Sequence, residues 1–156
     1  MTKALETLNP ADVAALTEIL RPIISAVVQS DRLALPYDLS FRFNSAPAAS
    51  EIIDYLVSAV PIRLPANAAG SVGYVDVNPS ALYILFLRRG GNLADPNSGD
   101  IIATISISDT GSFSFSTAGG LAIDIAVGAL LKLVGPATAD VGIRGVAFTM
   151  PLREID

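Results

Sequence analysis

Residues 101–116, IIATISISDTGSFSFS, decide the fold that we expect for this chain. Both halves are short runs of β-branched or aromatic residues in which apolar and polar residues tend to alternate, as in strands with one buried face. In the second half, Phe113 and Phe115 share one face of an extended strand, which we expect to line the core. Asp109, Thr110 and Gly111 between the halves are typical of a tight turn. The stretch therefore predicts an antiparallel β-hairpin.

Further runs of this kind occur along residues 36–156, each bounded by Gly, Pro, Asn or Asp. No pattern of helical length separates them, which disfavours alternating strands and helices. The spacing predicts a mainly β domain over residues 36–156, an antiparallel β-sandwich of jelly-roll-like or immunoglobulin-like type. Residues 121–131 fit either a short helix or a turn at Gly128 that leads into a strand. Besides the hairpin, the expected strands are 39–43, 52–64, 71–77, 81–87, 129–134 and 141–150.

Residues 1–35 have a helical pattern instead. Asn9 is a suitable N-cap, Pro10 suits the first helical position, and Pro22 should kink or split the helix. We therefore predict an N-terminal α-helical segment with an apolar stripe that must pack on something. Two interpretations fit equally: a helix folded back on its own domain, or a segment for oligomerisation or docking. The stripe consists of Val13, Leu16, Leu20, Ile23 and Val27.

The composition excludes several kinds of chemistry. The 156 residues include no His and no Cys, which removes thiol nucleophiles, Ser–His–Asp triads and the usual zinc sites. We expect the scattered acids Asp76, Asp109, Asp124 and Asp140 to be solvated turn residues, not members of a catalytic pair. The sequence thus predicts a protein that is not an enzyme and has no cofactor, no metal site and no catalytic residue.

Charge and hydropathy restrict the partners. The net charge is −5 and only two lysines occur, so we do not expect nucleic acid to bind. Charged residues make up 16% and mean hydropathy is +0.54, so the chain is more apolar than most soluble proteins. A membrane span is not expected, because Asp124 and Lys132 interrupt the best apolar run, 121–134. An assembly that covers apolar surface accounts for this composition better.

One loop is a candidate binding loop. Residues 92–100, NLADPNSGD, place Asn92, Asp95, Asn97 and Asp100 at spacings that could present oxygen atoms to Ca²⁺. The loop lacks the EF-hand pattern and a terminal bidentate Glu. We therefore favour an exposed hairpin tip, where such loops often bind partners.

From Tyr37 to about Pro151, the chain resembles a β-rich module of tailed-bacteriophage tail fibres and other virion structural proteins. The resemblance rests on YDLSF at 37–41, LPANAAGSVG at 64–73 and VGPATAD at 134–140, followed by the last strand. Where the family has Lys-Asn-Gly in a short hairpin, this chain has Arg88-Arg89-Gly90-Gly91 and an extended tip. The resemblance implies a virion component with a surface-exposed β-sandwich and contributes no catalytic residues.

Two hypotheses follow for the function. The first is a structural protein of the phage virion, in capsid decoration, a head fibre or a tail fibre, that assembles in the host cytoplasm through its N-terminal helix. Its partners would be other virion proteins and copies of itself, with a trimer expected from the fibre resemblance alone. The alternative is a host-attachment module that recognises a cell-surface glycan through its loops. An aromatic content of 6% without Trp counts against the alternative, because aromatic side chains are favoured binding anchors.

Overall fold

The computed structural model describes residues 36–155, which form ten strands and two short 3-10 helices. The predicted docking residues Val13, Leu16, Leu20, Ile23 and Val27 lie outside the described residues. The 3-10 helices are η1 (Ala66–Ala68) and η2 (Ala118–Gly120). The strands are β1 (Pro36–Phe43), β2 (Ile52–Val57), β3 (Ile62–Leu64), β4 (Val72–Val77), β5 (Tyr83–Arg89), β6 (Asp100–Ile107), β7 (Phe113–Thr117), β8 (Ile123–Ile125), β9 (Leu130–Val134) and β10 (Arg144–Glu154).

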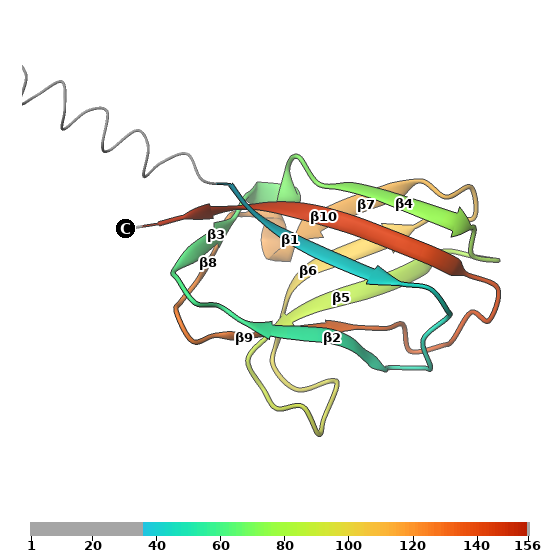
Figure 1. The fold of residues 1–156 in the computed structure, drawn as a ribbon, viewed down its shortest axis with the longest axis horizontal. Helices are drawn as coiled ribbons and strands as arrows, with labels where there is room; N and C mark the ends of the chain where they lie inside the picture. Colours follow the sequence, from blue (N-terminus) through green and yellow to red (C-terminus); the bar gives the residue numbers. More distant parts are fainter. Residues whose placement is uncertain (1–35, 156) are drawn as a thin grey trace, which may run out of the picture. The chain divides into compact units, whose positions relative to one another are not determined.

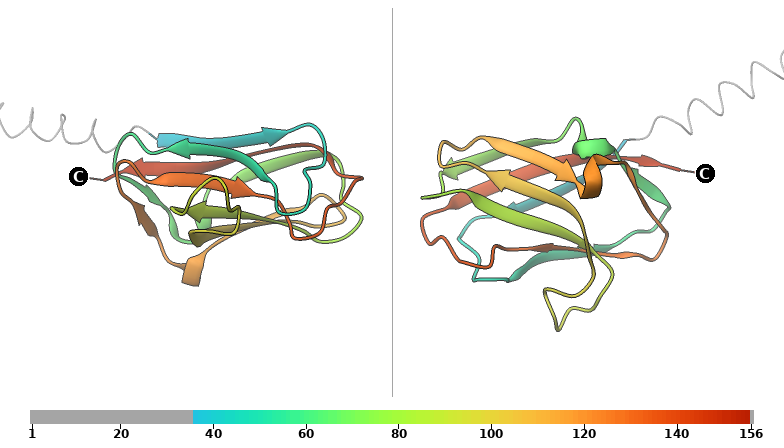
Figure 2. Two further views of the ribbon diagram at one scale, coloured as in Figure 1. Left: turned by 90° about the horizontal axis from the view of Figure 1, so that it is seen from below. Right: turned by 180° about the vertical axis from the view of Figure 1, so that it is seen from behind.

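The strands form two antiparallel sheets of five strands each (Figure 1). Sheet A has the order β1-β10-β3-β8, with β4 also paired to β10, and sheet B has the order β2-β9-β5-β6-β7. The two sheets lie in separate layers that face each other (Figure 2). This confirms the predicted mainly β, antiparallel class and is compatible with a β-sandwich.

The core lies between the two sheets because each strand turns alternate side chains inward. In β5, Leu85 and Leu87 are fully buried, whereas Ile84 and Phe86 between and beside them are only partly buried. The predicted hairpin is β6–β7, closed by a turn with Gly111 at φ +82°, and its two phenylalanines pack against the core as expected. The largest fully buried apolar side chains are Leu64, Leu85, Leu87, Ile102, Ile105, Ile107, Ile125, Leu131, Leu133, Ile143 and Met150.

The expectation of one strand over residues 52–64 is wrong. The chain breaks after Val57, so β2 belongs to sheet B and β3 to sheet A. Pro61 has no N–H to give to a ladder, and the Ser58 hydroxyl donates a hydrogen bond of 2.6 Å to the carbonyl of Val60. These features end β2 and let the chain cross from one layer to the other.

Residues 121–131 contain no helix. They form β8, and then a turn in which Gly128 has φ +78° precedes β9, as the interpretation with a turn predicted. Two of the acids expected in turns lie in strands instead: Asp124 is in β8 and Asp76 is in β4. Strand alternation in β8 was hard to recognise because the strand has only three residues.

The last strand is the longest and spans sheet A. Val146, Phe148, Met150 and Leu152 point into the core, which leaves a row of small side chains on the outer face of β10. Within residues 36–155, this outer face is open at Ala147. No helix in the described part of the chain has the length and apolarity to cross a membrane.

Candidate functional site

A buried lysine holds the tip that joins β5 to β6, residues 90–99. Lys132 lies on β9 between Leu131 and Leu133, which face the core, so its side chain leaves the opposite face of sheet B. The tip covers it completely, and 0% of the residue is exposed. Its Nζ donates to the Asn92 carbonyl at 2.8 Å, the Asp95 carbonyl at 2.7 Å and Ser98 Oγ at 2.8 Å. Burial lowers the pKa of Lys132, and the nearby charge of Asp95 partly opposes that shift.

Arg88 is the second cation beneath the tip. It lies directly opposite Lys132 in the pairing of β5 with β9. Its Nη1 donates to the carbonyls of Asn97 and Gly99 at 2.8 and 2.9 Å. Like charges at opposed positions repel each other, so the oxygen atoms of the tip compensate both cations at once. Arg88 and Lys132 together therefore fix the conformation of a loop that is exposed on its outer side.

Two of the four candidate loop residues, Asn92 and Asp95, use side-chain oxygens within the tip. Asn92 Oδ1 accepts hydrogen bonds from the amides of Ala94 and Asp95, and Asp95 Oδ1 accepts one from the Asn97 amide. The side chain of Asp100 is exposed, and its Oδ2 lies 3.7 Å from Arg89 Nη2. Lys132 Nζ binds backbone carbonyls of the tip and Ser98 Oγ, not the side-chain oxygens that the calcium interpretation used. Within residues 36–155, no group of three or more His, Cys, Asp or Glu could hold a metal.

The sequence contained a signal for the role of Lys132 as an anchor of the tip. It is one of only two lysines in the sequence and interrupts the apolar run of β9, Leu130–Val134. A lone lysine in a buried strand needs oxygen partners, because an unpaired charge in the interior is costly. The oxygen-rich tip supplies these partners from a part of the sequence some distance away.

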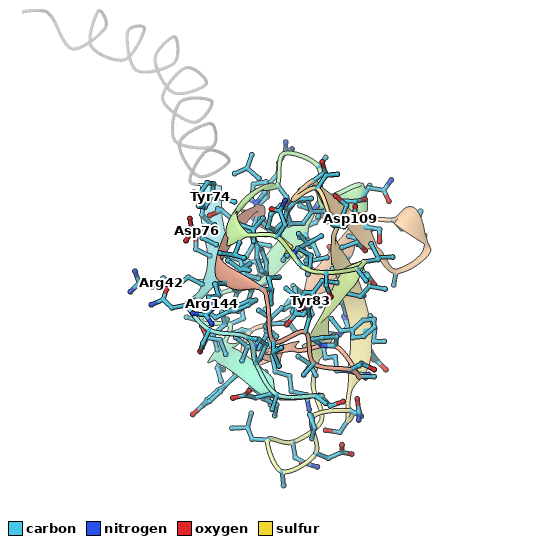
Figure 3. All side chains as sticks on the ribbon, turned by 90° about the vertical axis from the view of Figure 1, so that its right-hand side faces the viewer. Arg42, Tyr74, Asp76, Tyr83, Asp109 and Arg144 are labelled. Carbon is cyan, nitrogen blue, oxygen red and sulfur yellow. The ribbon has the colours of Figure 1, made fainter. Side chains whose placement is uncertain are left out.

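A groove of about 520 Å³ lies on the outer face of sheet A, where β1, β10 and β4 run side by side (Figure 1). Pairing places Arg42, Ala147 and Tyr74 in one row across the three strands, and Ser40, Thr149 and Val72 in a neighbouring row. Figure 3 shows Arg42 and Tyr74 on the same side of the domain. The complete lining is Ser40, Phe41, Arg42, Asp54, Val72, Gly73, Tyr74, Ala147, Phe148 and Thr149.

The groove combines an aromatic side chain with separate hydrogen-bonding groups. Tyr74 is 65% exposed, and the hydroxyls of Ser40 and Thr149 lie 2.9 Å apart. Asp54 Oδ1 accepts from the amide of Tyr55 at 2.8 Å, while Oδ2 has no partner among residues 36–155. Arg42 likewise makes no hydrogen bond or ion pair within the described chain. Sequence inspection missed these residues because they converge through strand register, not through a motif.

Two of the four scattered acids have structural partners instead of forming a pair. Asp124 binds Arg63 across β3 and β8 with two hydrogen bonds of 2.5 and 2.9 Å, which lower the pKa of Asp124 and raise that of Arg63. Asp140 accepts from the Gly142 amide and from the amide and hydroxyl of Ser80. These hydrogen bonds lower the pKa of Asp140 and tie the loop before β5 to the loop before β10.

Comparison with models of known protein families finds none that matches, and no curated protein matches the sequence. The resemblance to phage virion modules therefore stays a prediction from the residues themselves.

Proposed function

We propose that this chain is a non-enzymatic structural protein of a bacteriophage particle, in capsid decoration, a head fibre or a tail fibre. In this proposal, residues 1–35 form a helical segment that docks or oligomerises, and residues 36–156 form a jelly-roll-like or immunoglobulin-like β-sandwich exposed on the particle. The partners are other virion proteins and copies of the chain, with a trimer as the expected oligomer.

One observation supports this proposal above the others: the two sheets of residues 36–155 cover each other's apolar faces. Leu85 and Leu87 from sheet B and Leu64 and Met150 from sheet A are all 0% exposed. In the proposal, the apolar stripe predicted in residues 1–35 packs on another surface of the particle, because an amphipathic helix gains stability by burying its apolar side. A domain with a complete core and a separate apolar segment suits a protein that is mounted on an assembly.

The rigid tip is compatible with exposure on a particle. Its backbone carbonyls bind Lys132 and Arg88, and its side chains Asn92 and Asp95 cap its own amides. The alternative function, glycan recognition through the loops, would need these polar groups to face a ligand. Because Asn92 and Asp95 are engaged inside the tip, we keep the structural role as the main proposal.

The oligomer proposal is tested by comparing the full chain with a variant lacking residues 1–35. Circular dichroism reports the β structure of each protein, and light scattering coupled to chromatography reports its mass. We expect the shortened protein to keep its strand signal and to lose the mass of the oligomer. A shortened protein that retains the oligomeric mass would refute the role of residues 1–35.

The virion proposal needs a second experiment. Mass spectrometry of density-purified phage particles, from a culture in which the chain is produced, should detect its peptides at a constant ratio to the major capsid protein. Peptides that remain entirely in the soluble lysate would exclude a virion component.

A further inference from the structure

The groove on the outer face of sheet A has the chemistry of a binding site that the structural role does not use. We propose that it binds a neutral polysaccharide, with one pyranose ring against Tyr74 and the sugar hydroxyls on Arg42 and Asp54. The proposal concerns residues of β1, β2, β4 and β10 only and does not depend on residues 1–35.

The shape of the groove follows from the register of three strands. Ala147 lies between Arg42 and Tyr74 in the cross-strand row, and neighbouring strands are about 4.8 Å apart. A small side chain between two long ones leaves a trough whose floor is β10. Since successive outward positions on β10 are also small, the trough can continue along the strand and admit an extended chain.

The size of the groove suits a small ligand or a few units of a polymer. Its volume of about 520 Å³ falls within the range of about 300–1,000 Å³ typical of ligand pockets. Such sites combine apolar lining with a small number of polar groups that orient the ligand. Here Val72, Tyr74 and Ala147 supply apolar surface, while the polar groups stand at the sides.

The available donors and acceptors match sugar hydroxyls. The guanidinium of Arg42 only donates, the free oxygen of Asp54 only accepts, and a sugar hydroxyl does both. The hydroxyls of Ser40 and Thr149 bond to each other, and each retains capacity for a further partner. The positive charge of Arg42 and the negative charge of Asp54 balance within the groove, so a neutral ligand needs no charge of its own to bind there.

Tyr74 supplies the aromatic surface of the site. It points outward from β4 because its neighbours Gly73 and Val75 face inward, where they meet Phe113 and the core. The C–H face of a pyranose is apolar and packs well on an aromatic ring. Tyr74 and Arg42 project from the same side of the domain in Figure 3, and they flank Ala147 in one cross-strand row. The net charge of −5 additionally disfavours a polyanionic glycan.

Saturation-transfer NMR and isothermal calorimetry on the full chain test the proposal. The probes are four neutral trisaccharides: maltotriose, cellotriose, mannotriose and galactotriose. A trigalacturonate serves as the acidic counterpart of galactotriose. We expect saturable binding of at least one neutral trisaccharide with a dissociation constant of about 1 mM, which corresponds to a binding free energy of about −4 kcal/mol.

Matched variants locate the binding. Tyr74→Ala and Arg42→Gln should each weaken it about tenfold, equivalent to about 1.4 kcal/mol. The controls are Tyr55→Ala, at an exposed tyrosine of sheet B, and Arg153→Gln, on β10 outside the groove. Both controls should leave the affinity within about twofold, and circular dichroism should show all four variants folded.

Three results would overturn the proposal. These are no saturable binding of any neutral trisaccharide, equal loss in Tyr55→Ala and Tyr74→Ala, and tighter binding of trigalacturonate than of galactotriose. None of them affects the proposed assembly role, which is judged from the mass of the protein with and without residues 1–35.

Discussion

Replacing Lys132 by Met tests whether an internal ammonium holds the tip. Met has a similar length and an apolar end, so it fits the space without offering a donor. The change removes three hydrogen bonds of 2.7–2.8 Å, to the carbonyls of Asn92 and Asp95 and to Ser98 Oγ. A hydrogen bond to a charged group contributes about 1.5–3 kcal/mol, so the gross loss is at least about 4.5 kcal/mol.

Two effects reduce that loss. A buried ammonium costs several kcal/mol in lost hydration, and the Met variant no longer bears this cost. Asn92 and Asp95 are exposed residues, so water can replace part of the lost bonding to their carbonyls. We therefore expect Lys132→Met to lower the free energy of unfolding by about 2–3 kcal/mol.

Urea denaturation measures the predicted change. With a slope of about 2 kcal/mol per molar urea, the midpoint should fall by about 1–1.5 M. Hydrogen exchange should also become faster at the amides of Ala94, Asp95, Asn97 and Ser98 in the tip. Ser98→Ala is the comparison: it removes one partner of Lys132 and the neutral bonds of Ser98 Oγ to the Asn92 and Asp95 backbone, keeps two of the three ammonium bonds, and should cost less. An unchanged midpoint together with unchanged exchange in the tip would refute the structural role of Lys132.

Three further predictions concern contacts elsewhere in the domain. Gly73→Ala should destabilise the protein by about 1–3 kcal/mol, because the added Cβ would lie 2.3 Å from Phe113 Cδ1. Adding Phe113→Leu to that variant should recover part of the lost stability, measured by urea denaturation. A gain in stability, as Gly→Ala often gives, would show that the ring moves aside freely. Asp140→Asn should lower the urea midpoint near pH 7. Because folding lowers the pKa of Asp140, the difference in midpoint between the parent protein and the variant should be full above about pH 4 and should decrease as pH falls through the pKa of Asp140 in the folded protein. A difference independent of pH would contradict this assignment. Arg63→Gln should cause a small loss that disappears in about 1 M NaCl, since Arg63 and Asp124 are both about half exposed; a loss that persists in salt would mean that packing, not charge, dominates.

Local chemistry in the sequence predicted much of the fold. The hairpin over residues 101–116 could be recognised because alternation and a Gly turn are local signals, and both reappear as β6, β7 and Gly111 at φ +82°. The break between β2 and β3 had a local signal in Pro61, which cannot donate to a ladder, but only pairing assigns the two segments to different sheets. Strand boundaries of this kind depend on distant partners.

The candidate sites also separate what the local sequence predicts from what the pairing of distant strands decides. The sequence by itself determined the absence of His and Cys, the oxygen-rich composition of residues 92–100 and the rarity of lysine. Only the tertiary structure decided that Lys132 fills that loop, and that Arg42, Ala147 and Tyr74 share one row. The physical reason is that composition and turn preference belong to neighbouring residues. Strand register, in contrast, brings together side chains that are distant in the chain.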